Sequence, residues 1–377
     1  MAFSLIKILR RFLPDFLRSG PKLARPQWRA IRAITQCRTP ALGGQRFVCE
    51  PCGTTTFVYH SCNHKACPQC GRDASAQWVE RELSKRILAT YFLVTFTLPS
   101  ELRSLFFGKD AKEAYDLFFS SAAAALQDCL ANPKWLGATT SGFTAVLHTW
   151  NQQLLFHPHL HVIVPAAGID RLGNVIFGKH EKFLVPLPAL RSAFRHHFRE
   201  GMRKREWGVD PVVWHTDWGI HIQPVGSGAS AIKYLGTYVR RTAISEHRIL
   251  NADDSSVTFA WEDRAHGNAT KRLTLSANEF MARYLRHALP AKLHSTRYYG
   301  WCHPAARRTR ERIAFHSGRP LFAPAPPPKP DRSPKCPCCQ KPMEYDDDVK
   351  PLYWLMNFKL MAWSRVPVCT PIPKAPT

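Results

Sequence analysis

The segment HPHLH (157–161) carries three alternate histidines and is followed by the apolar run Val162–Val164. In an extended chain, side chains alternate between the two faces, so the histidines share one face. Two neutral imidazoles spaced in this way can bind one divalent metal ion. The apolar run indicates a core strand, with His159 and His161 on the face that would bind the metal. A surface strand that is rich in histidine and binds no metal is the alternative.

Two imidazoles need a third polar ligand to hold an ion such as Mg²⁺ or Mn²⁺. Gln152, in the loop before the histidine segment, is the first candidate. His148, on the preceding strand, is the second candidate. An alternative role for His148 is to hold one of the ligands in place.

Two tyrosines, Tyr234 and Tyr238, lie four residues apart in the segment KYLGTYVRR. Residues i and i+4 share one face of a helix, so both phenols could reach one phosphate in turn. A tyrosine hydroxyl is a weak nucleophile unless a cation reduces the charge on the phosphate that it attacks. Lys233, Arg240 and Arg241 would supply phosphate contacts beside the phenols. The alternative is a packing pair of tyrosines followed by a solvated helix end.

Most of the cysteines form two clusters, one early in the chain and one near its end. Cys49-x₂-Cys52 and Cys67-x₂-Cys70 are separated by 14 residues, which is typical of a zinc site with four thiolates. We therefore expect these four to hold one structural Zn²⁺ that folds a segment too short to be stable alone. The late segment 336–339 is half a site without a partner in the tail, and could equally be incidental. Other candidates, for substitution or for a second site, are Cys37, His60, Cys62 and His64.

The segments that must position these side chains alternate between strand-like and helix-like patterns. Two adjacent strands joined by a short loop favour an antiparallel α+β fold over a doubly wound sheet. We expect strands at 91–98, 143–150 and 159–164, and helices at 110–131, 188–207, 228–242 and 276–289.

Composition divides the chain into four parts. Residues 1–35 mix apolar and basic residues at helical spacing, which indicates a basic helical segment that docks on its own domain rather than a signal peptide. Residues 36–75 form the expected zinc-binding module, and residues 85–315 the catalytic domain. Residues 316–377 are a Pro-rich linker and a tail that contains cysteines.

The charge of the chain identifies the kind of partner. Lys and Arg number 52 against 28 Asp and Glu, a formal net charge of +24. Such a field favours a polyanion, and nucleic acid is the usual one. No segment approaches the roughly 20 apolar residues of a membrane span. We therefore expect a protein that binds DNA or RNA in a reducing compartment, where clustered thiols bind metal rather than form disulfides.

The histidine strand followed by the tyrosine helix resembles the HUH endonucleases, which include rolling-circle replication initiators, relaxases and certain transposases. The sequence is most similar to the two-tyrosine insertion-sequence transposases that carry an N-terminal zinc-binding domain. The resemblance extends from about Cys37 to Gly300. Its motifs are CRTPALGG, CEPC, YHSCNHKACPQC, LHTWNQ, HPHLHVIVP, YLGTYVRRTAIS, LTLSANEFMARYLRHALP and RYYG.

The resemblance implies an HUH antiparallel sheet flanked by helices, with His159 and His161 as the metal-binding pair and Tyr234 and Tyr238 as the nucleophiles. Gln152 matches a polar position in the family's His-Thr-Trp-Gly-Gln stretch, where this chain has Asn in place of the Gly. The chain also has HKAC where relatives have Arg-His-Cys, which leaves the exact zinc ligands open.

The implied activity is rolling-circle transposition. Single-stranded DNA at the element ends is cut with Mg²⁺ or Mn²⁺, held as a 5′-phosphotyrosine and transferred to target DNA, while Zn²⁺ is structural. The protein would act in the cytoplasm, at the nucleoid. The alternatives are a plasmid-type replication initiator or relaxase, and a zinc-finger DNA-binding protein in which the histidines and tyrosines are structural.

Overall fold

The computed structural model describes residues 3–239, 242–263, 266–319 and 333–352, apart from the side chains of residues 72, 73, 237 and 238. The chain forms two compact units. The first unit comprises residues 1–35 and 62–330, and the second comprises residues 36–61 and 331–377. The predicted zinc-binding module at 36–75 is therefore divided between the two units.

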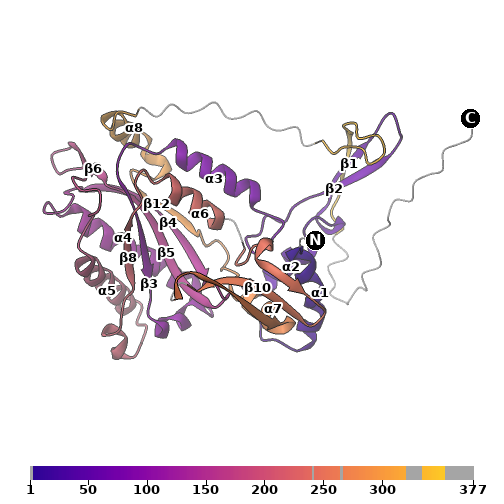
Figure 1. Cartoon of the computed structure of the whole chain (residues 1–377), viewed down its shortest axis with the longest axis horizontal. Coiled ribbons are helices and arrows are strands. Elements are labelled where there is room, and N and C mark those ends of the chain that lie inside the picture. The colour runs from indigo at the N-terminus through magenta and orange to yellow at the C-terminus, as the bar shows by residue number, and fades with distance from the viewer. Residues whose placement is uncertain (1–2, 240–241, 264–265, 320–332, 353–377) are drawn as a thin grey trace, which may run out of the picture. The chain divides into compact units, whose positions relative to one another are not determined.

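The first unit is built on one seven-stranded sheet with the order β7-β6-β4-β5-β3-β8, and β12 pairs with β4 (Figure 1). Every pairing within it is antiparallel, which confirms the predicted α+β class. The strands are β3 (Tyr91–Thr97), β4 (Thr140–Trp150), β5 (Phe156–Pro165), β6 (Ala167–Ile169), β7 (Val175–Phe177), β8 (Ile220–Pro224) and β12 (Thr296–Gly300).

The three predicted strands correspond to β3, β4 and β5, because each alternates or runs apolar over most of its length. The four predicted helices are also present. The strands β6, β7, β8 and β12 were not predicted, since none is longer than five residues and so short a segment carries too little pattern to be recognised. The helices are α4 (Ala111–Ala131), α5 (Leu187–Arg203), α6 (Ala229–Val239) and α7 (Ala277–Arg286).

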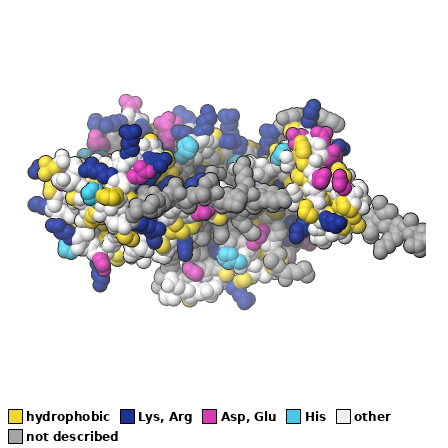
Figure 2. All heavy atoms as spheres, turned by 90° about the horizontal axis from the view of Figure 1, so that it is seen from above, with side chains coloured by type: hydrophobic (Ala, Val, Ile, Leu, Met, Phe, Trp, Pro, Cys, Tyr) yellow, Lys and Arg dark blue, Asp and Glu magenta, His cyan; other side chains and the backbone are white. Residues whose placement is uncertain are grey.

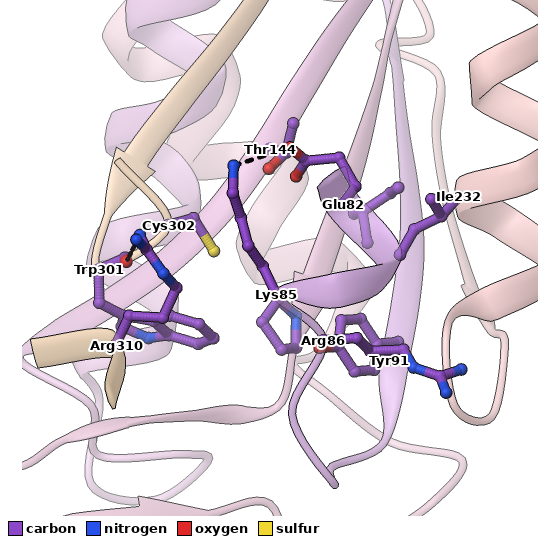
Figure 3. Close-up of a pocket in the computed structure, with 11 residues that line it drawn as sticks. Glu82, Lys85, Arg86, Tyr91, Thr144, Ile232, Trp301, Cys302 and Arg310 are labelled. Carbon is purple, nitrogen blue, oxygen red and sulfur yellow. Dashed lines mark hydrogen bonds and ion pairs between the residues drawn. The ribbon is translucent and has the colours of Figure 1, made fainter. Parts of the chain in front are cut away.

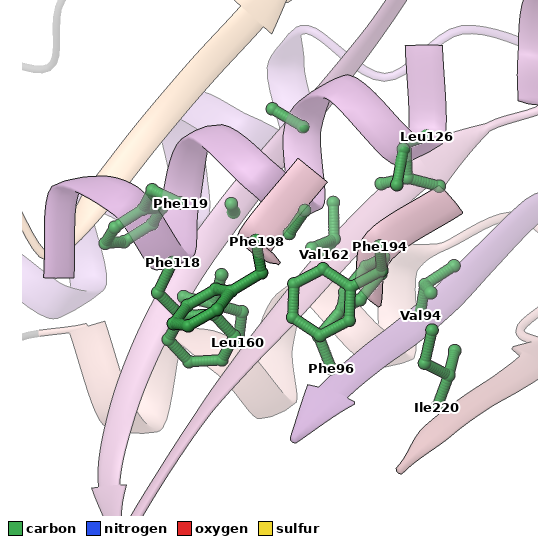
Figure 4. Packing of buried hydrophobic residues seen from close by; sticks show 14 of the residues in the cluster. Val94, Phe96, Phe118, Phe119, Leu126, Leu160, Val162, Phe194, Phe198 and Ile220 are labelled. Carbon is green, nitrogen blue, oxygen red and sulfur yellow. The ribbon is translucent and has the colours of Figure 1, made fainter. Parts of the chain in front are cut away.

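One face of the sheet carries the main core, which α4 and α5 cover (Figure 4). Leu160 and Val162 of β5 point into this core together with Phe96 of β3, against Phe118 of α4 and Phe194 of α5. Because side chains alternate along a strand, burial of these residues sends the neighbouring histidines to the opposite face.

The opposite face of the sheet packs against α3 (Arg72–Ser84), α6 and α8 (Arg307–His316). Gly236, between the two tyrosines of α6, permits the close approach of α3 and α6 that Figure 1 shows. A Cβ at this position would lie 1.9 Å from Cγ2 of Val79. The helix that carries the tyrosines is thus held against both the sheet and α3.

A smaller layer of the first unit follows the tyrosine helix in the sequence. The antiparallel strands β9 (Ile249–Ala252), β10 (Ser256–Asp263) and β11 (Ala269–Ser276) pack with α7. The helix α1 (Leu5–Arg18) buries its apolar face and packs on α7, and α2 (Arg25–Gln36) follows it. The amphipathic N-terminal segment therefore docks on its own domain. Across the described ranges, no helix is both long and apolar enough to cross a bilayer.

The second unit contains a three-stranded antiparallel sheet with the order β13-β1-β2. Its strands are β1 (Gly44–Val48), β2 (Thr55–Tyr59) and β13 (Glu344–Val349). Part of the predicted tail thus pairs with a strand that lies almost 300 residues earlier. Residues 320–332 and 353–377 of this segment lie outside the described residues.

Candidate metal and nucleophile site

Three histidines from two neighbouring strands meet on the face of the sheet that α6 covers. His148 of β4 lies directly opposite His159 of β5 in the strand register. One ring nitrogen each of His148, His159 and His161 lies within 4.8 Å of the others. The ring centroids are 4.6 to 5.2 Å apart. Strand register therefore brings three potential ligands together.

Hydrogen bonds of the Nδ1 atoms determine which ring nitrogens can face a metal. Nδ1 of His159 donates to the backbone carbonyl of His157 at 2.7 Å, so its proton is on Nδ1 and Nε2 presents a lone pair. Nδ1 of His161 lies 3.0 Å from the hydroxyl of Thr95, its cross-strand neighbour on β3. Nε2 is the remaining nitrogen on both rings, as is typical of metal-binding histidines with an oriented ring.

His148 is fully buried and contributes a third neutral imidazole. Burial, together with the neighbouring His161 and His159, lowers the pKa of His148 well below its usual value. A neutral imidazole is the form that binds a metal. The structure thus brings the second of the two predicted candidates for the third ligand to the pair. Gln152 is half-buried in the loop between β4 and β5, and its role as a ligand stays a prediction.

His157 shares the histidine face but has a different partner. The guanidinium of Arg103 donates to Nδ1 of His157 at 3.0 Å. Burial and this arginine lower the pKa of His157. His157 is not a member of the three-histidine cluster, which contains His148 instead.

The three-histidine cluster fits a divalent metal ion by three observations of this structure. The ligand atoms come from two adjacent core strands, they lie within 4.8 Å of one another, and two of the rings are oriented through Nδ1. A divalent ion held by the three imidazoles would have further ligand positions open to water, Gln152 or a phosphate oxygen.

The structure places one predicted nucleophile beside this cluster. The ring centroid of Tyr234, on α6, lies 6.3 Å from that of His161, with the rings nearly perpendicular. Tyr234 is 37% exposed, so this residue is partly open to solvent. Tyr238 lies one turn further along α6, but its side chain is outside those described. Lys233 is exposed, and Arg240 and Arg241 lie outside the described residues.

The cysteines of the second unit form a four-thiol group that joins the early and late parts of the sequence. Its members lie within 4.8 Å of one another, and Sγ of Cys49 is 3.5 Å from Sγ of Cys339. Zn–S bonds of about 2.3 Å in a tetrahedron place sulfurs about 3.8 Å apart, so the group fits Zn²⁺. Cys339, burial and Cys49 raise the pKa of Cys52 to about 12, whereas a backbone hydrogen bond from Cys339 lowers the pKa of Cys336 to about 6. The four are Cys49, Cys52, Cys336 and Cys339.

Cys67 and Cys70 belong to a different group, in the first unit, together with Cys62. Sγ of Cys62 is 3.6 Å from Sγ of Cys70. The prediction that the two early pairs share one zinc site is therefore wrong, because the β1–β2 hairpin folds with the late pair instead. The late segment 336–339 was identified as a half-site, but its partner was sought in the tail and not in the early pair of Cys49 and Cys52.

A pocket on the α3 side of the sheet contains none of these functional residues (Figure 3). Its polar lining includes Glu82 and Lys85, which pair at 3.1 Å, and Arg310, which donates to the Trp301 carbonyl. Burial raises the pKa of the Cys302 thiol in this pocket, which disfavours its ionised form. The three-histidine cluster therefore remains the candidate site for the chemistry.

Positive charge is widespread on the surface. On the face shown in Figure 2, Lys and Arg side chains are spread over the visible surface rather than gathered on one element. This distribution agrees with the strongly positive net charge of the chain and suits a polyanionic ligand.

Comparison with known proteins identifies the family. Residues 142–310 match a family model described as "Putative transposase", and residues 8–98 match one described as "Transposase zinc-binding domain". A protein of Sinorhizobium fredii named "Putative transposase y4qJ" is 34% identical over 78% of this chain and 79% of its own length. The chain belongs to the IS91-type family of insertion-sequence transposases.

A second relative agrees with this assignment. The transposase for insertion sequence element IS801 of Pseudomonas savastanoi is 25% identical over 72% of this chain and 69% of its own length. No solved structure matches the chain. Membership of the family means that DNA is the substrate and that the reaction is the cutting and joining of DNA strands. The region 142–310, which matches the model described as "Putative transposase", contains the three histidines and both tyrosines.

Proposed function

We propose that the first unit is a metal-dependent nuclease and strand transferase for single-stranded DNA, and that it moves its element by a rolling-circle route. The observation that carries this proposal is the position of the Tyr234 ring 6.3 Å from the His161 ring of the three-histidine cluster. A nucleophile beside a cation site is the arrangement that phosphoryl transfer by tyrosine requires.

The proposed residues hold the reactants in place for a transesterification. A Mg²⁺ or Mn²⁺ ion bound by His148, His159 and His161, with Gln152 as a further ligand, would supply positive charge to the oxygens of the scissile phosphate. Oη of Tyr234 bonds to phosphorus, and its proton passes to solvent.

The bond between phosphorus and the 3′ oxygen breaks in the same step, and the 3′ oxygen takes up a proton. The products are a 5′-phosphotyrosine and a free 3′-OH, so the phosphoester is conserved for rejoining. Tyr238, one turn along α6, would receive a second strand. Lys233, Arg240 and Arg241 would contact the neighbouring phosphates.

The cysteine groups have a structural part in this proposal. Zn²⁺ bound by the four thiols of the second unit would hold its small sheet together. Cys62, Cys67 and Cys70 would bind a second Zn²⁺ with a fourth ligand, for which the sequence candidates are Cys37, His60 and His64.

Covalent capture tests the proposal. The full chain is mixed with Mn²⁺ and labelled single strands from both flanks of its own gene, and the products are separated on a denaturing gel. We expect an adduct that needs metal, survives denaturant and is lost in His159→Ala and in the double variant Tyr234→Phe/Tyr238→Phe. Tyr299→Phe is the matched control, because this half-buried tyrosine donates to the Phe119 carbonyl away from the site.

The alternatives give different results in the same assay. An adduct on a plasmid origin but on neither flank would indicate a replication initiator or relaxase. Plain DNA binding that is unchanged in His159→Ala, with no adduct on any strand, would indicate a DNA-binding protein without this chemistry.

A further inference from the structure

The loop between the two histidine strands has an unusual hydrogen-bond pattern. Residues 151–155 connect β4 to β5. His148 lies near the end of β4, and the other two histidines of the cluster lie on β5. The side chain of Asn151 accepts from the backbone N–H groups of Gln153 and Leu155, at 3.0 and 2.9 Å. Leu154 has a φ of 61°, in the left-handed region that non-glycine residues seldom adopt. Such a conformation persists only where the surroundings determine it.

This loop has three successive backbone carbonyls, of residues 152, 153 and 154, that accept hydrogen bonds from side chains. Each of them accepts a hydrogen bond from a different side chain of the segment that follows the tyrosine helix. We call these three side chains the carbonyl clamp. They are Arg248, which donates to residue 152; Arg283, which donates to residue 153 at 2.9 Å; and His287, whose Nε2 donates to residue 154 at 3.1 Å.

Each arginine of the carbonyl clamp is itself held in position. Nε of Arg248 donates to the Ala260 carbonyl of β10 at 2.8 Å. Nε of Arg283 donates to the Glu279 carboxylate, one turn earlier on α7, at 2.7 Å. The planar fork of a guanidinium can serve both partners at once, which a lysine could not do in the same geometry.

The third member of the carbonyl clamp connects the loop to the strand of His148. His287 is buried, and because its Nε2 proton is donated to the loop, its Nδ1 accepts from the hydroxyl of Thr149 at 3.2 Å. Trp150 lies between the two histidines: its ring stacks on that of His148 with centroids 5.6 Å apart and contacts His287 edge to face at 5.8 Å.

We propose that Arg248, Arg283 and His287 are positioning residues that set the loop 151–155, and through it Gln152 and His148, for metal binding. This inference rests on the proposed function, because it assigns the clamp to the metal of that site. The layer of β9, β10, β11 and α7 thereby controls the geometry of the three-histidine cluster without contacting the metal.

Direct measurement of metal affinity tests the inference. Mn²⁺ is titrated into the full, zinc-loaded chain, and free Mn²⁺ is followed by electron paramagnetic resonance. We expect Arg283→Ala to raise the Kd for Mn²⁺ roughly tenfold, the lower end of the effect of removing partners that orient metal ligands. Arg195→Ala is the matched control, because Arg195 also donates to a backbone carbonyl, that of Trp214 at 3.0 Å, but on α5. Its Kd should equal that of the wild type.

His159→Ala separates the two hypotheses. If the wild type does not bind Mn²⁺, or His159→Ala does not weaken binding, the metal site of the proposed function fails. If His159→Ala abolishes binding while folded Arg283→Ala keeps the wild-type Kd, the carbonyl clamp is overturned and the metal site stands. Arg283→Lys serves where the alanine variant does not fold: a Kd raised about threefold supports the clamp, and an unchanged Kd overturns it.

Discussion

The two units hold their metal-binding side chains in different ways. In the first unit, core side chains such as Leu160 and Val162 fix the strand register, and the histidines follow from it. In the second unit, the small core consists of Phe47, Met343 and the cysteines themselves. We therefore expect the fold to form the first site before any metal binds, and the second unit to need its metal in order to fold.

The two units also differ in charge. The described residues of the second unit carry five Lys and Arg against five Asp and Glu, whereas the whole chain carries 52 against 28. The positive excess therefore lies outside this part of the chain. A small zinc module can recognise DNA or support the architecture of a larger protein, and the lack of net charge favours the supporting role for the second unit.

The largest expected effect is the loss of zinc from the second unit. Cys336→Ser removes one of four thiolates, and structural Zn²⁺ contributes on the order of 10 kcal/mol to the folding of such modules. We expect one Zn²⁺ fewer per chain by elemental analysis, and rapid proteolysis of residues 36–61. Cys129→Ser is the control, because this buried thiol lies in α4 outside both cysteine groups.

The same Cys336→Ser variant tests the contrast between the units. Mn²⁺ binding by the three-histidine cluster should be unchanged, since the sheet of the first unit holds that cluster. Zinc content equal to that of the wild type would contradict the four-thiol site. Loss of Mn²⁺ binding would show that the first site is not independently formed.

Neighbouring residues of β5 should separate stability from metal binding. Leu160→Ala removes a fully buried side chain from the main core, and we expect the free energy of unfolding of the first unit to fall by about 3 kcal/mol. His161 lies on the opposite face of β5. We expect His161→Ala to weaken Mn²⁺ binding more than a hundredfold and to lower the free energy of unfolding less than Leu160→Ala does. Chemical denaturation and Mn²⁺ titration of both variants measure this. Equal losses of stability would show that the histidines are core residues.

The three strands at the centre of the sheet, β3, β4 and β5, could be predicted because each carries its own pattern. Alternation in HPHLH identified both the strand and the face on which the histidines lie, and the breaks at Pro99 and Pro290 limited a strand and a helix. The spacing of Tyr234 and Tyr238 likewise placed both residues on α6. These features depend on residues that are close in the sequence.

Other features depend on contacts between residues that are far apart in the sequence. Spacing alone could not show that Cys49 folds with Cys339, because the partner strands β1 and β13 lie almost 300 residues apart. Arg248 and Arg283 were also missed, since their acceptors are backbone carbonyls, which every residue offers. His148 was predicted only as a second candidate, because a ligand and an orienting histidine have the same local sequence.

Gly236 offers a test of how closely the tyrosine helix must approach its neighbour. Gly236→Ala places a methyl group against the side chain of Val79 on α3, and such overpacking costs about 2 kcal/mol. We expect a matching loss of stability and reduced adduct formation, because α6 must shift away from α3. Gly236→Ala combined with Val79→Ala should recover both, as measured by denaturation and by the covalent-capture gel. Failure of this double variant to recover would show that the steric contact is not the cause.

The smallest expected effect concerns pH. Burial lowers the pKa of His287 to about 4, against about 6.5 in the unfolded chain. A folded-state pKa below the unfolded value gives a contribution to stability that is complete above pH 6.5 and is lost as the pH falls toward 4. When the pH falls from 7 to 5.5, the free energy of unfolding of the first unit should decrease by about 1 kcal/mol, because His287 takes up a proton more readily in the unfolded chain.

Comparison of wild type with His287→Gln isolates this contribution, because glutamine can donate to the Leu154 carbonyl but does not titrate. Denaturation at pH 7 and pH 5.5 should show a smaller pH dependence in the variant, by the same 1 kcal/mol or so. His197→Gln is the control, since His197 is an exposed partner of Asp128 on the far side of the sheet. If the pH dependence of His287→Gln equals that of the wild type, His287 is accessible to protons in the folded protein. The carbonyl clamp would then open in mild acid, unlike the core that lies under the three-histidine cluster.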